Sequence, residues 1–204
     1  MQNGYLITFE GIDGCGKSTA ANLLAEYMQA VGHKVTLTYE PGAGQLGSKL
    51  RYMLLSDSAL KPEVRAEALL FAADRAAHME EIILPALRAG HIVLCDRFTD
   101  STLAYQGGGR GLCVSFLDQL NEFASFGIKP RITFLLDLPQ QLARQRRGQS
   151  QDRLEREDEE FFARIAVVYH KLAAAEPDRI KILDASQTPQ QILSEMIAAI
   201  ESLY

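Results

Sequence analysis

Residues 11–18 decide the fold, and they read Gly11-Ile12-Asp13-Gly14-Cys15-Gly16-Lys17-Ser18. This stretch matches the pattern G-x-x-x-x-G-K-[ST], which requires a strand before it and a helix after it. Both are predicted, because residues 5–10 are apolar until Glu10 and residues 19–30 have a helical pattern. Glycines let backbone N–H groups converge on phosphate oxygens, and the helix N-terminus adds its positive dipole end. The stretch therefore predicts a phosphate-binding loop (P-loop) rather than a glycine turn that only caps a helix.

Two side chains of the P-loop have distinct expected roles. Lys17 is expected to reach the β- and γ-phosphates of ATP, and the Ser18 hydroxyl is expected to hold Mg²⁺. The predicted ATP-binding residues are Gly11, Ile12, Asp13, Gly14, Cys15, Gly16, Lys17, Ser18 and Thr19. A P-loop indicates nucleotide binding but not its use, since small-molecule kinases, GTPase switches and mechanical ATPases all contain one.

The composition narrows the class of protein. A chain of 204 residues fits one domain, expected here to cover residues 1–204. The net charge of -5 argues against non-specific binding to nucleic acid or to an anionic membrane. Three cysteines without ligand-like spacing favour a reducing cytoplasm. No signal peptide or membrane span is expected, because no apolar run is long enough.

Short apolar runs alternate with longer helical patterns, which is typical of βαβ units on a parallel sheet. The expected strands are Leu6–Glu10, Val35–Tyr39, Ile92–Cys95, Ile132–Leu136 and Ile180–Leu183. The expected helices are Lys17–Ala30, Pro62–Ala89 with a kink or a restart at Pro85, Ser115–Ala124, Glu157–Ala175 and Pro189–Leu203. The prediction is an α/β fold, a doubly wound five-stranded parallel sheet flanked by helices, with ligands at the carboxyl ends of the strands.

The third expected strand runs into Asp96-Arg97-Phe98, which places an acid and a guanidinium beside the P-loop. Asp96 is expected to position Mg²⁺ or its waters, and Arg97 to clamp a phosphate with two hydrogen bonds. The alternative is a surface ion pair without a ligand. No guanine-reading N-K-x-D sequence is present, which argues against a GTPase switch. Together these features favour a small-molecule kinase.

Five blocks of sequence resemble the thymidylate kinase family in the order of that family. They are residues 9–19, Glu40-Pro41-Gly42, Leu70-Phe71-Ala72-Ala73-Asp74-Arg75, Asp96-Arg97-Phe98, and Ala104-Tyr105-Gln106-Gly107-Gly108-Gly109-Arg110-Gly111. The resemblance, which runs from residue 5 to about residue 200, implies the P-loop nucleoside monophosphate kinase fold. It also implies ATP-dependent phosphorylation of dTMP to dTDP, and a homodimer in the bacterial cytoplasm.

Four positions depart from the family pattern: Tyr39, Ala43, Gly44 and Ser48. The second block usually reads Arg-Glu-Pro-Gly-Gly-Thr, but here residues 39–44 read Tyr-Glu-Pro-Gly-Ala-Gly, and Ser48 stands where the family often has Glu. One arginine near the acceptor phosphate is therefore absent. We expect an altered affinity for dTMP rather than a different substrate.

The acceptor needs a surface for a flat base, donors for its carbonyls and charge for its phosphate. Phe71 and Arg75 lie four positions apart on an expected helix and therefore share a face, where a ring can stack on the base and a guanidinium can donate to O4. The resemblance implies that this pair reads thymine; the alternative is a core Phe71 and a solvated Arg75. Gln106 suits the pyrimidine edge because an amide both donates and accepts, and Ser101 and Thr102 are expected to assist at N3.

The remaining acceptor contacts follow from the resemblance. It implies that Tyr105 packs against the sugar and that the Asp13 carboxylate binds the 3′-hydroxyl, a role compatible with that of an acid at a helix N-terminus. Arg51 and Arg97 are then expected at the 5′-phosphate. The predicted dTMP-binding residues are Asp13, Arg51, Phe71, Arg75, Arg97, Ser101, Thr102, Tyr105 and Gln106. The glycines of residues 107–111 favour either a close backbone turn or a mobile cover.

Basic residues concentrate in residues 144–156, which contain Arg144, Arg146, Arg147, Arg153 and Arg156. The segment resembles the lid of bacterial thymidylate kinases, which closes over ATP and brings in an arginine. Arg147 and Arg153 are the candidate catalytic arginines, beside Lys17 and Arg97. The alternative is a solvated loop that pairs with the acids after it. Two other functions stay open: another deoxynucleotide or nucleoside kinase, and an ATP-switched binding protein without phosphoryl transfer.

Overall fold

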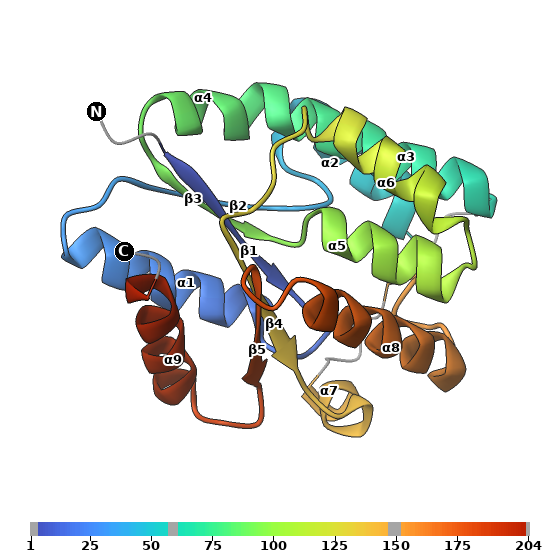
Figure 1. Ribbon diagram of the computed structural model, residues 1–204. Coiled ribbons are helices and arrows are strands. Elements are labelled where there is room, and N and C mark those ends of the chain that lie inside the picture. Colours follow the sequence, from blue (N-terminus) through green and yellow to red (C-terminus); the bar gives the residue numbers. More distant parts are fainter. Residues whose placement is uncertain (1–3, 57–60, 147–151, 203–204) are drawn as a thin grey trace.

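A five-stranded parallel sheet forms the centre of the molecule (Figure 1), and its strands follow the order β2-β3-β1-β4-β5. The computed structural model describes residues 4–56, 61–146 and 152–202. The strands are β1 (Tyr5–Glu10), β2 (Val35–Tyr39), β3 (Ile92–Asp96), β4 (Ile132–Asp137) and β5 (Ile180–Asp184). The predicted α/β fold with five parallel strands is therefore confirmed, and each predicted strand lies within one residue of its observed bounds.

The register of the central strands brings the functional segments together. β1 pairs with β3, where Phe9 lies opposite Asp96, and β1 pairs on its other side with β4, where Glu10 lies opposite Leu135. Parallel strands have their carboxyl ends at one edge of the sheet. The P-loop after β1 and the Asp96-Arg97 pair after β3 therefore share that edge.

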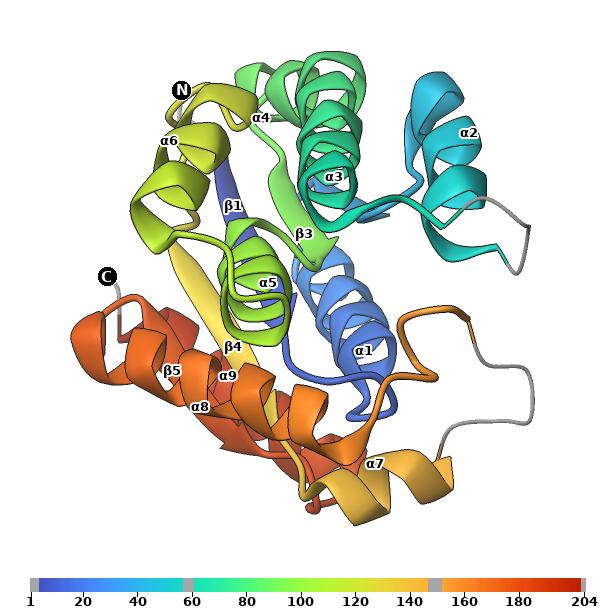
Figure 2. The same cartoon turned by 90° about the vertical axis from the view of Figure 1, so that its right-hand side faces the viewer.

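Helices cover both faces of the sheet (Figures 1 and 2). α1 and α9 pack together on one face, and α3, α6 and α8 lie on the other with α5. The helices are α1 (Lys17–Ala30), α2 (Gly44–Leu55), α3 (Val64–His78), α4 (Leu84–Arg88), α5 (Thr99–Thr102), α6 (Val114–Ala124), α7 (Gln140–Arg146), α8 (Glu159–Ala175) and α9 (Pro189–Glu201). Within the ranges that the structure describes, no helix has the length and apolar character needed to cross a bilayer.

The expected helix Pro62–Ala89 is in fact three segments. α3 passes into a π-helical turn, η1 (Met79–Ile83), and the chain then continues as α4 with Pro85 in its first turn. Proline has no N–H to donate and its ring crowds the carbonyl four residues earlier, so the regular hydrogen-bond pattern changes before it. The predicted interruption at Pro85 is confirmed. Four helical segments were not predicted: α2, α5, α7 and the π-helical η2 (Leu103–Gly109).

The glycines at positions 107–109 lie where two helical segments pack against each other. Gly107 to Gly109 belong to η2, which packs against α8. A Cβ atom on Gly108 would lie 2.6 Å from Val168 Cγ2 and 3.0 Å from the Arg164 carbonyl oxygen. Of the two expectations for these glycines, a close approach of the backbone is the one observed, because they let two helical segments pack closely together.

Candidate active site

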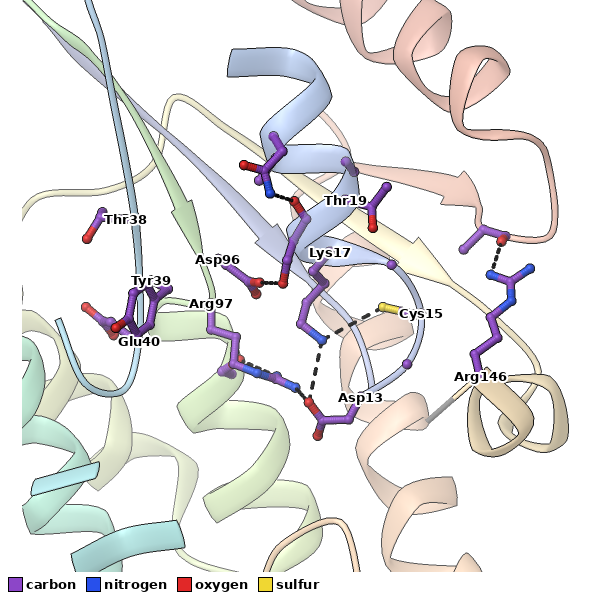
Figure 3. Close-up of a pocket in the computed structure, with 18 of the residues that line it drawn as sticks. Asp13, Cys15, Lys17, Thr19, Thr38, Tyr39, Glu40, Asp96, Arg97 and Arg146 are labelled. Atoms are coloured by element: carbon purple, nitrogen blue, oxygen red, sulfur yellow. Dashed lines mark hydrogen bonds and ion pairs between the residues drawn. The ribbon is translucent and has the colours of Figure 1, made fainter. Parts of the chain in front are cut away.

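A cavity of about 870 Å³ opens at the carboxyl edge of the sheet. Figure 3 shows residues of this cavity, with the P-loop between Tyr39 and Glu40 on one side and Arg146 on the other. Its wall comes from the P-loop, the start of α1, the ends of β2 and β3, and the loop after β5. The cavity therefore extends to both sides of the phosphate-binding loop.

The P-loop has the backbone shape that its glycines predicted. Gly11, Gly14 and Gly16 have φ angles of 132°, 85° and 99°, which side chains with a Cβ rarely adopt. A Cβ atom on Gly11 would lie 2.6 Å from the Leu136 carbonyl oxygen, so β4 also requires a glycine there. The loop leads directly into α1, whose N-terminus favours an anion. Residues 13–19 line the cavity, whereas Gly11 and Ile12 do not.

The Lys17 side chain folds back over the P-loop. Its ammonium group donates to the carbonyl oxygens of Gly11 (3.2 Å) and Ile12 (3.0 Å), and it lies 3.8 Å from Asp13 Oδ1. Only 6 % of the residue is exposed. A buried cation at this place strongly favours a negative ligand, since few water molecules screen it.

Ser18 and Asp96, the two expected metal ligands, lie side by side. The Ser18 hydroxyl donates to Asp96 Oδ2 over 2.5 Å (Figure 3), although the two residues come from α1 and β3. A hydroxyl and a carboxylate oxygen are donors that Mg²⁺ prefers. The donor set at this point therefore fits a magnesium ion.

Asp13, Arg97 and Tyr105 form a connected cluster at the cavity wall. Arg97 Nη2 donates to Asp13 Oδ1 (2.6 Å) and to the Tyr105 hydroxyl oxygen (3.0 Å), and the Tyr105 hydroxyl donates to Asp13 Oδ2 (3.1 Å). Arg97 Nη1 donates to the hydroxyl oxygen of Ser101 (3.1 Å). Burial alone would raise the pKa of Asp13, but the charges of Arg97 and Lys17 hold that pKa below its ordinary value. Asp13 is thus an ionised acceptor beside two cations.

Three further predicted acceptor residues are placed as follows. Arg51 and Phe71 line the cavity, as does Ser101. The Arg51 guanidinium donates from Nη1 to the Pro41 carbonyl oxygen (2.7 Å) and lies 5.9 Å from the centre of the Tyr39 ring. Tyr39, at the departure from the family pattern, is itself part of the wall. This end of the cavity combines an aromatic surface with a guanidinium.

The comparison with known proteins agrees with this geometry. The family model described as thymidylate kinase matches residues 9–197. A thymidylate kinase of Desulfovibrio desulfuricans is 47% identical over 96% of this chain and 94% of its own length. One of Pelotomaculum thermopropionicum is 43% identical over 98% of this chain and 94% of its own length. The crystal structure of thymidylate kinase from Ehrlichia chaffeensis superposes with a TM-score of 0.82, at 34% identity over 98% of this chain and 99% of that one.

The chain belongs to the thymidylate kinase family. The family match covers the P-loop, both walls of the cavity and the loop after β5. Every block on which the resemblance was recognised therefore lies inside the matched range, and the fold of the family is the fold observed here.

Not every residue expected from the family pattern lies at the cavity in this structure. Arg75, Thr102 and Gln106 are 3 %, 3 % and 2 % exposed and lie outside the cavity lining. The Arg75 guanidinium donates to Glu40 Oε2 (2.9 Å), and further hydrogen bonds go to the oxygens of Thr102, Asn121 and Phe98. The structure thus separates the pair expected to read thymine: Phe71 faces the cavity and Arg75 lies behind the wall. The Arg75 guanidinium is neither solvated nor exposed to the cavity, since protein acceptors surround it.

Of the two candidate lid arginines, Arg147 and Arg153, the structure describes the position of Arg153 only. Arg147 lies outside the described residues. Arg153 does not line the cavity; its guanidinium donates to Glu67 Oε2 (2.6 Å) and to the Leu54 carbonyl oxygen (3.0 Å). Glu67 is 1 % exposed, so this ion pair is shielded from water on the carboxylate side.

Arg146 is a cavity residue that the sequence analysis did not single out for a role. It lies at the end of α7, lines the cavity, and donates from Nη1 to the Ala185 carbonyl oxygen (2.9 Å; Figure 3). Gln187 and Pro189, in and after the same loop, line the cavity beside it. The available signals were the basic segment of residues 144–156, which contains Arg146, and the position of the loop after the last strand, where α/β sheets bind ligands.

Proposed function

We propose that this member of the thymidylate kinase family transfers the γ-phosphoryl group of ATP directly to the 5′-phosphate of dTMP, giving dTDP and ADP, within the cavity described above. The observation that carries the proposal is the position of the P-loop between two differently built ends of one cavity. Phosphoryl transfer depends on holding donor and acceptor in line and on placing positive charge around the transferred group. Lys17 and Arg97 both lie near Asp13, at the junction of the two ends.

On the nucleotide side, we assign ATP binding to the P-loop and to Lys17. The backbone of residues 13–18 would surround the β- and γ-phosphates, and the N-terminus of α1 favours their charge. Ser18 and Asp96 would hold Mg²⁺, which supplies charge neutralisation at the phosphates when bound. The base would lie toward Arg146, which Figure 3 shows on the side of the P-loop away from Tyr39 and Glu40.

On the acceptor side, Phe71 would stack on the thymine ring, with Ser101 beside it as a hydrogen-bonding partner. Asp13 would accept a hydrogen bond from the 3′-hydroxyl, and Tyr105 would limit the space at the sugar. Arg97 would bind the 5′-phosphate with help from Arg51. The buried Arg75, Thr102 and Gln106 would act from behind this wall rather than as its surface.

An acceptor screen tests the proposed function. The purified protein is incubated with ATP, Mg²⁺ and one of dTMP, dCMP, dGMP or UMP, and ADP release and the phosphorylated product are both measured. We expect dTMP to be the preferred acceptor. A pocket whose hydrogen-bonding groups match the carbonyls and N–H group of thymine leaves some of these groups unpaired when another base binds. Equal rates with all four acceptors would contradict dTMP specificity, and ADP release without a phosphorylated acceptor would indicate an ATP switch.

The lid arginine remains part of the proposal and is tested by Arg153→Ala. We expect kcat to fall about 100-fold, within the range by which single transition-state contacts contribute, with little change in the KM for dTMP. This requires that Arg153 exchanges its Glu67 partner for phosphate during the reaction. Arg144→Ala is the matched control, because Arg144 is 65% exposed and pairs with Glu159. If Arg153→Ala raised only the KM for dTMP, Arg153 would belong to the acceptor site and not to the lid.

A homodimer is the remaining proposal on partners. Four large apolar side chains on α3 and α6 are exposed, namely Leu69 (54%), Val114 (53%), Phe116 (49%) and Phe123 (81%). The two helices lie side by side (Figure 1), so a second copy of the chain could cover these side chains together. Light scattering is expected to give twice the chain mass of 22.6 kDa, and a mass of one chain would contradict the dimer.

A reducing, cytoplasmic location is likewise proposed from the three free thiols Cys15, Cys95 and Cys113.

A further inference from the structure

Glu10, the last residue of β1, is a fully buried acid that does not line the cavity. Each of its two carboxylate oxygens accepts two hydrogen bonds. Oε1 accepts from the backbone N–H groups of Phe98 (2.8 Å) and Ser101 (3.2 Å). Oε2 accepts from the hydroxyl groups of Ser101 (2.5 Å) and Tyr169 (2.8 Å). One side chain therefore binds the segment that follows Arg97 at two backbone positions.

Arg97 has a backbone conformation that needs such support. Its φ angle is 71°, in the left-handed region that a residue with a Cβ adopts only at a cost. Residues in sparsely populated conformations persist when the surrounding structure determines them from several sides. The Arg97 N–H donates to the Phe9 carbonyl oxygen (2.9 Å), and Glu10 binds the next N–H group, that of Phe98.

Arg75 holds the same segment from the opposite direction. Its Nη2 donates to the Phe98 carbonyl oxygen (2.9 Å), while Glu10 accepts from the Phe98 N–H. A buried carboxylate and a buried guanidinium thus fix both polar backbone groups of the residue after Arg97. This backbone in turn sets the direction in which the Arg97 side chain leaves the chain, toward Asp13 and Tyr105.

We propose that Glu10 is a positioning residue for Arg97: by binding the backbone of Phe98 and Ser101, it aims the Arg97 guanidinium at the phosphate of the acceptor nucleotide. The inference rests on the proposed contact between Arg97 and the 5′-phosphate of dTMP. Glu10 itself touches no substrate in this assignment. Glu10 also holds Ser101, the proposed partner of the base, so its loss should weaken dTMP binding more than thymidine binding and should spare ATP.

The charge of Glu10 is not what the positioning requires. Burial, together with the nearby Asp100, raises the pKa of Glu10 to about 7. A protonated Glu10 still offers Oε1 as an acceptor for both backbone N–H groups, and so does a glutamine. Glu10→Gln therefore keeps the geometry that we consider essential, whereas Glu10→Leu keeps the approximate volume and removes every acceptor.

The experiment compares the binding of dTMP with that of thymidine, which has the same base and sugar but no phosphate. For Glu10→Leu we expect calorimetry to show a loss of dTMP affinity that exceeds the loss of thymidine affinity by about 10-fold or more, the range for a misplaced charge-assisted contact. ATP affinity should change by less than about 2-fold. Glu10→Gln should restore most of the dTMP affinity. Tyr169→Phe is the matched control, because it removes one hydroxyl partner of Glu10 and leaves both backbone hydrogen bonds in place.

Three results would overturn the inference. The first is that Glu10→Leu binds dTMP like the wild type. The second is that it loses dTMP and thymidine affinity to the same extent, as a merely structural role predicts. The third is additivity, in which Arg97→Ala costs as much dTMP affinity in the Glu10→Leu protein as in the wild type. If Glu10 acts through Arg97, that cost should be smaller in the Glu10→Leu protein. If Glu10→Leu does not fold, Glu10→Asp provides the same comparison, because a side chain one methylene shorter cannot hold all four partners. A wild-type protein that does not distinguish dTMP from thymidine would instead contradict the proposed role of Arg97.

Discussion

Replacing Lys17 by alanine is expected to lower kcat about 10³-fold, the upper range for the loss of a single preorganised charge contact in an active site. Lys17 is the buried cation of the P-loop, and its ammonium group lies within hydrogen-bonding distance of two loop carbonyl oxygens. Charge that develops on the phosphoryl oxygens during transfer would lose its closest neutralising group. Steady-state kinetics with saturating ATP and dTMP measure the effect.

The control for this prediction is Lys171→Ala on α8, which removes an exposed lysine outside the cavity lining. It should leave kcat unchanged within error. Because Lys17 also binds the loop itself, circular dichroism and thermal unfolding of the Lys17→Ala protein need to show a folded chain. A folded variant with a kcat within about 10-fold of the wild type would be inconsistent with the phosphate role of Lys17.

Replacing Arg97 by alanine is expected to lower kcat/KM for dTMP about 10³-fold, which corresponds to about 4 kcal/mol. Two effects combine. The acceptor phosphate loses a guanidinium partner, and the Asp13 carboxylate loses the cation that lies 2.6 Å away. Without Arg97 the pKa of Asp13 should rise toward its ordinary value, since the charge of Arg97 is the main influence that lowers it against burial.

The Arg97 variant is measured over a range of dTMP concentrations at saturating ATP. Arg97→Lys is expected to recover only part of the activity, because an ammonium group cannot donate in the forked geometry of a guanidinium. Arg88→Ala, which removes an exposed arginine of α4, serves as the control. An unchanged kcat/KM for dTMP in Arg97→Ala would remove Arg97 from the acceptor site and with it the basis of the inference on Glu10.

The sequence was sufficient for the elements whose signals are local. The P-loop is made by backbone atoms of consecutive residues, so its glycines and the strand and helix around it carry the information. The buried strands were also recognisable, because apolar runs covered on both faces differ from amphipathic helices. The helices α5 and α7 were missed because they are short and rich in polar residues, so their packing partners, not their own periodicity, stabilise them. The longer α2 was missed although Leu46, Leu50 and Leu54 recur every four residues.

The tertiary structure alone decided which side chains reach the cavity. Phe71 and Arg75 share a helix face by spacing, yet Arg75 is drawn behind the wall by Glu40, 35 positions earlier, and by Asn121, 46 positions later. Arg153 similarly pairs with Glu67, which is 86 positions away. The spacing of two residues along a helix restricts the directions in which their side chains point. Whether a charged side chain reaches the cavity then depends on whether the fold places a buried residue of opposite charge close enough to form an ion pair with it.

The P-loop at residues 11–18 and the five parallel strands were thus determined by the sequence itself, because each depends on neighbours in the chain. The surroundings of Arg97 were not. Its left-handed backbone, the four hydrogen bonds of Glu10 behind it and the contact with Asp13 join β1, β3, α5 and α8. These contacts form only when the strands are in register, which is why the order of the sheet, rather than any motif, sets the direction of the acceptor-site guanidinium.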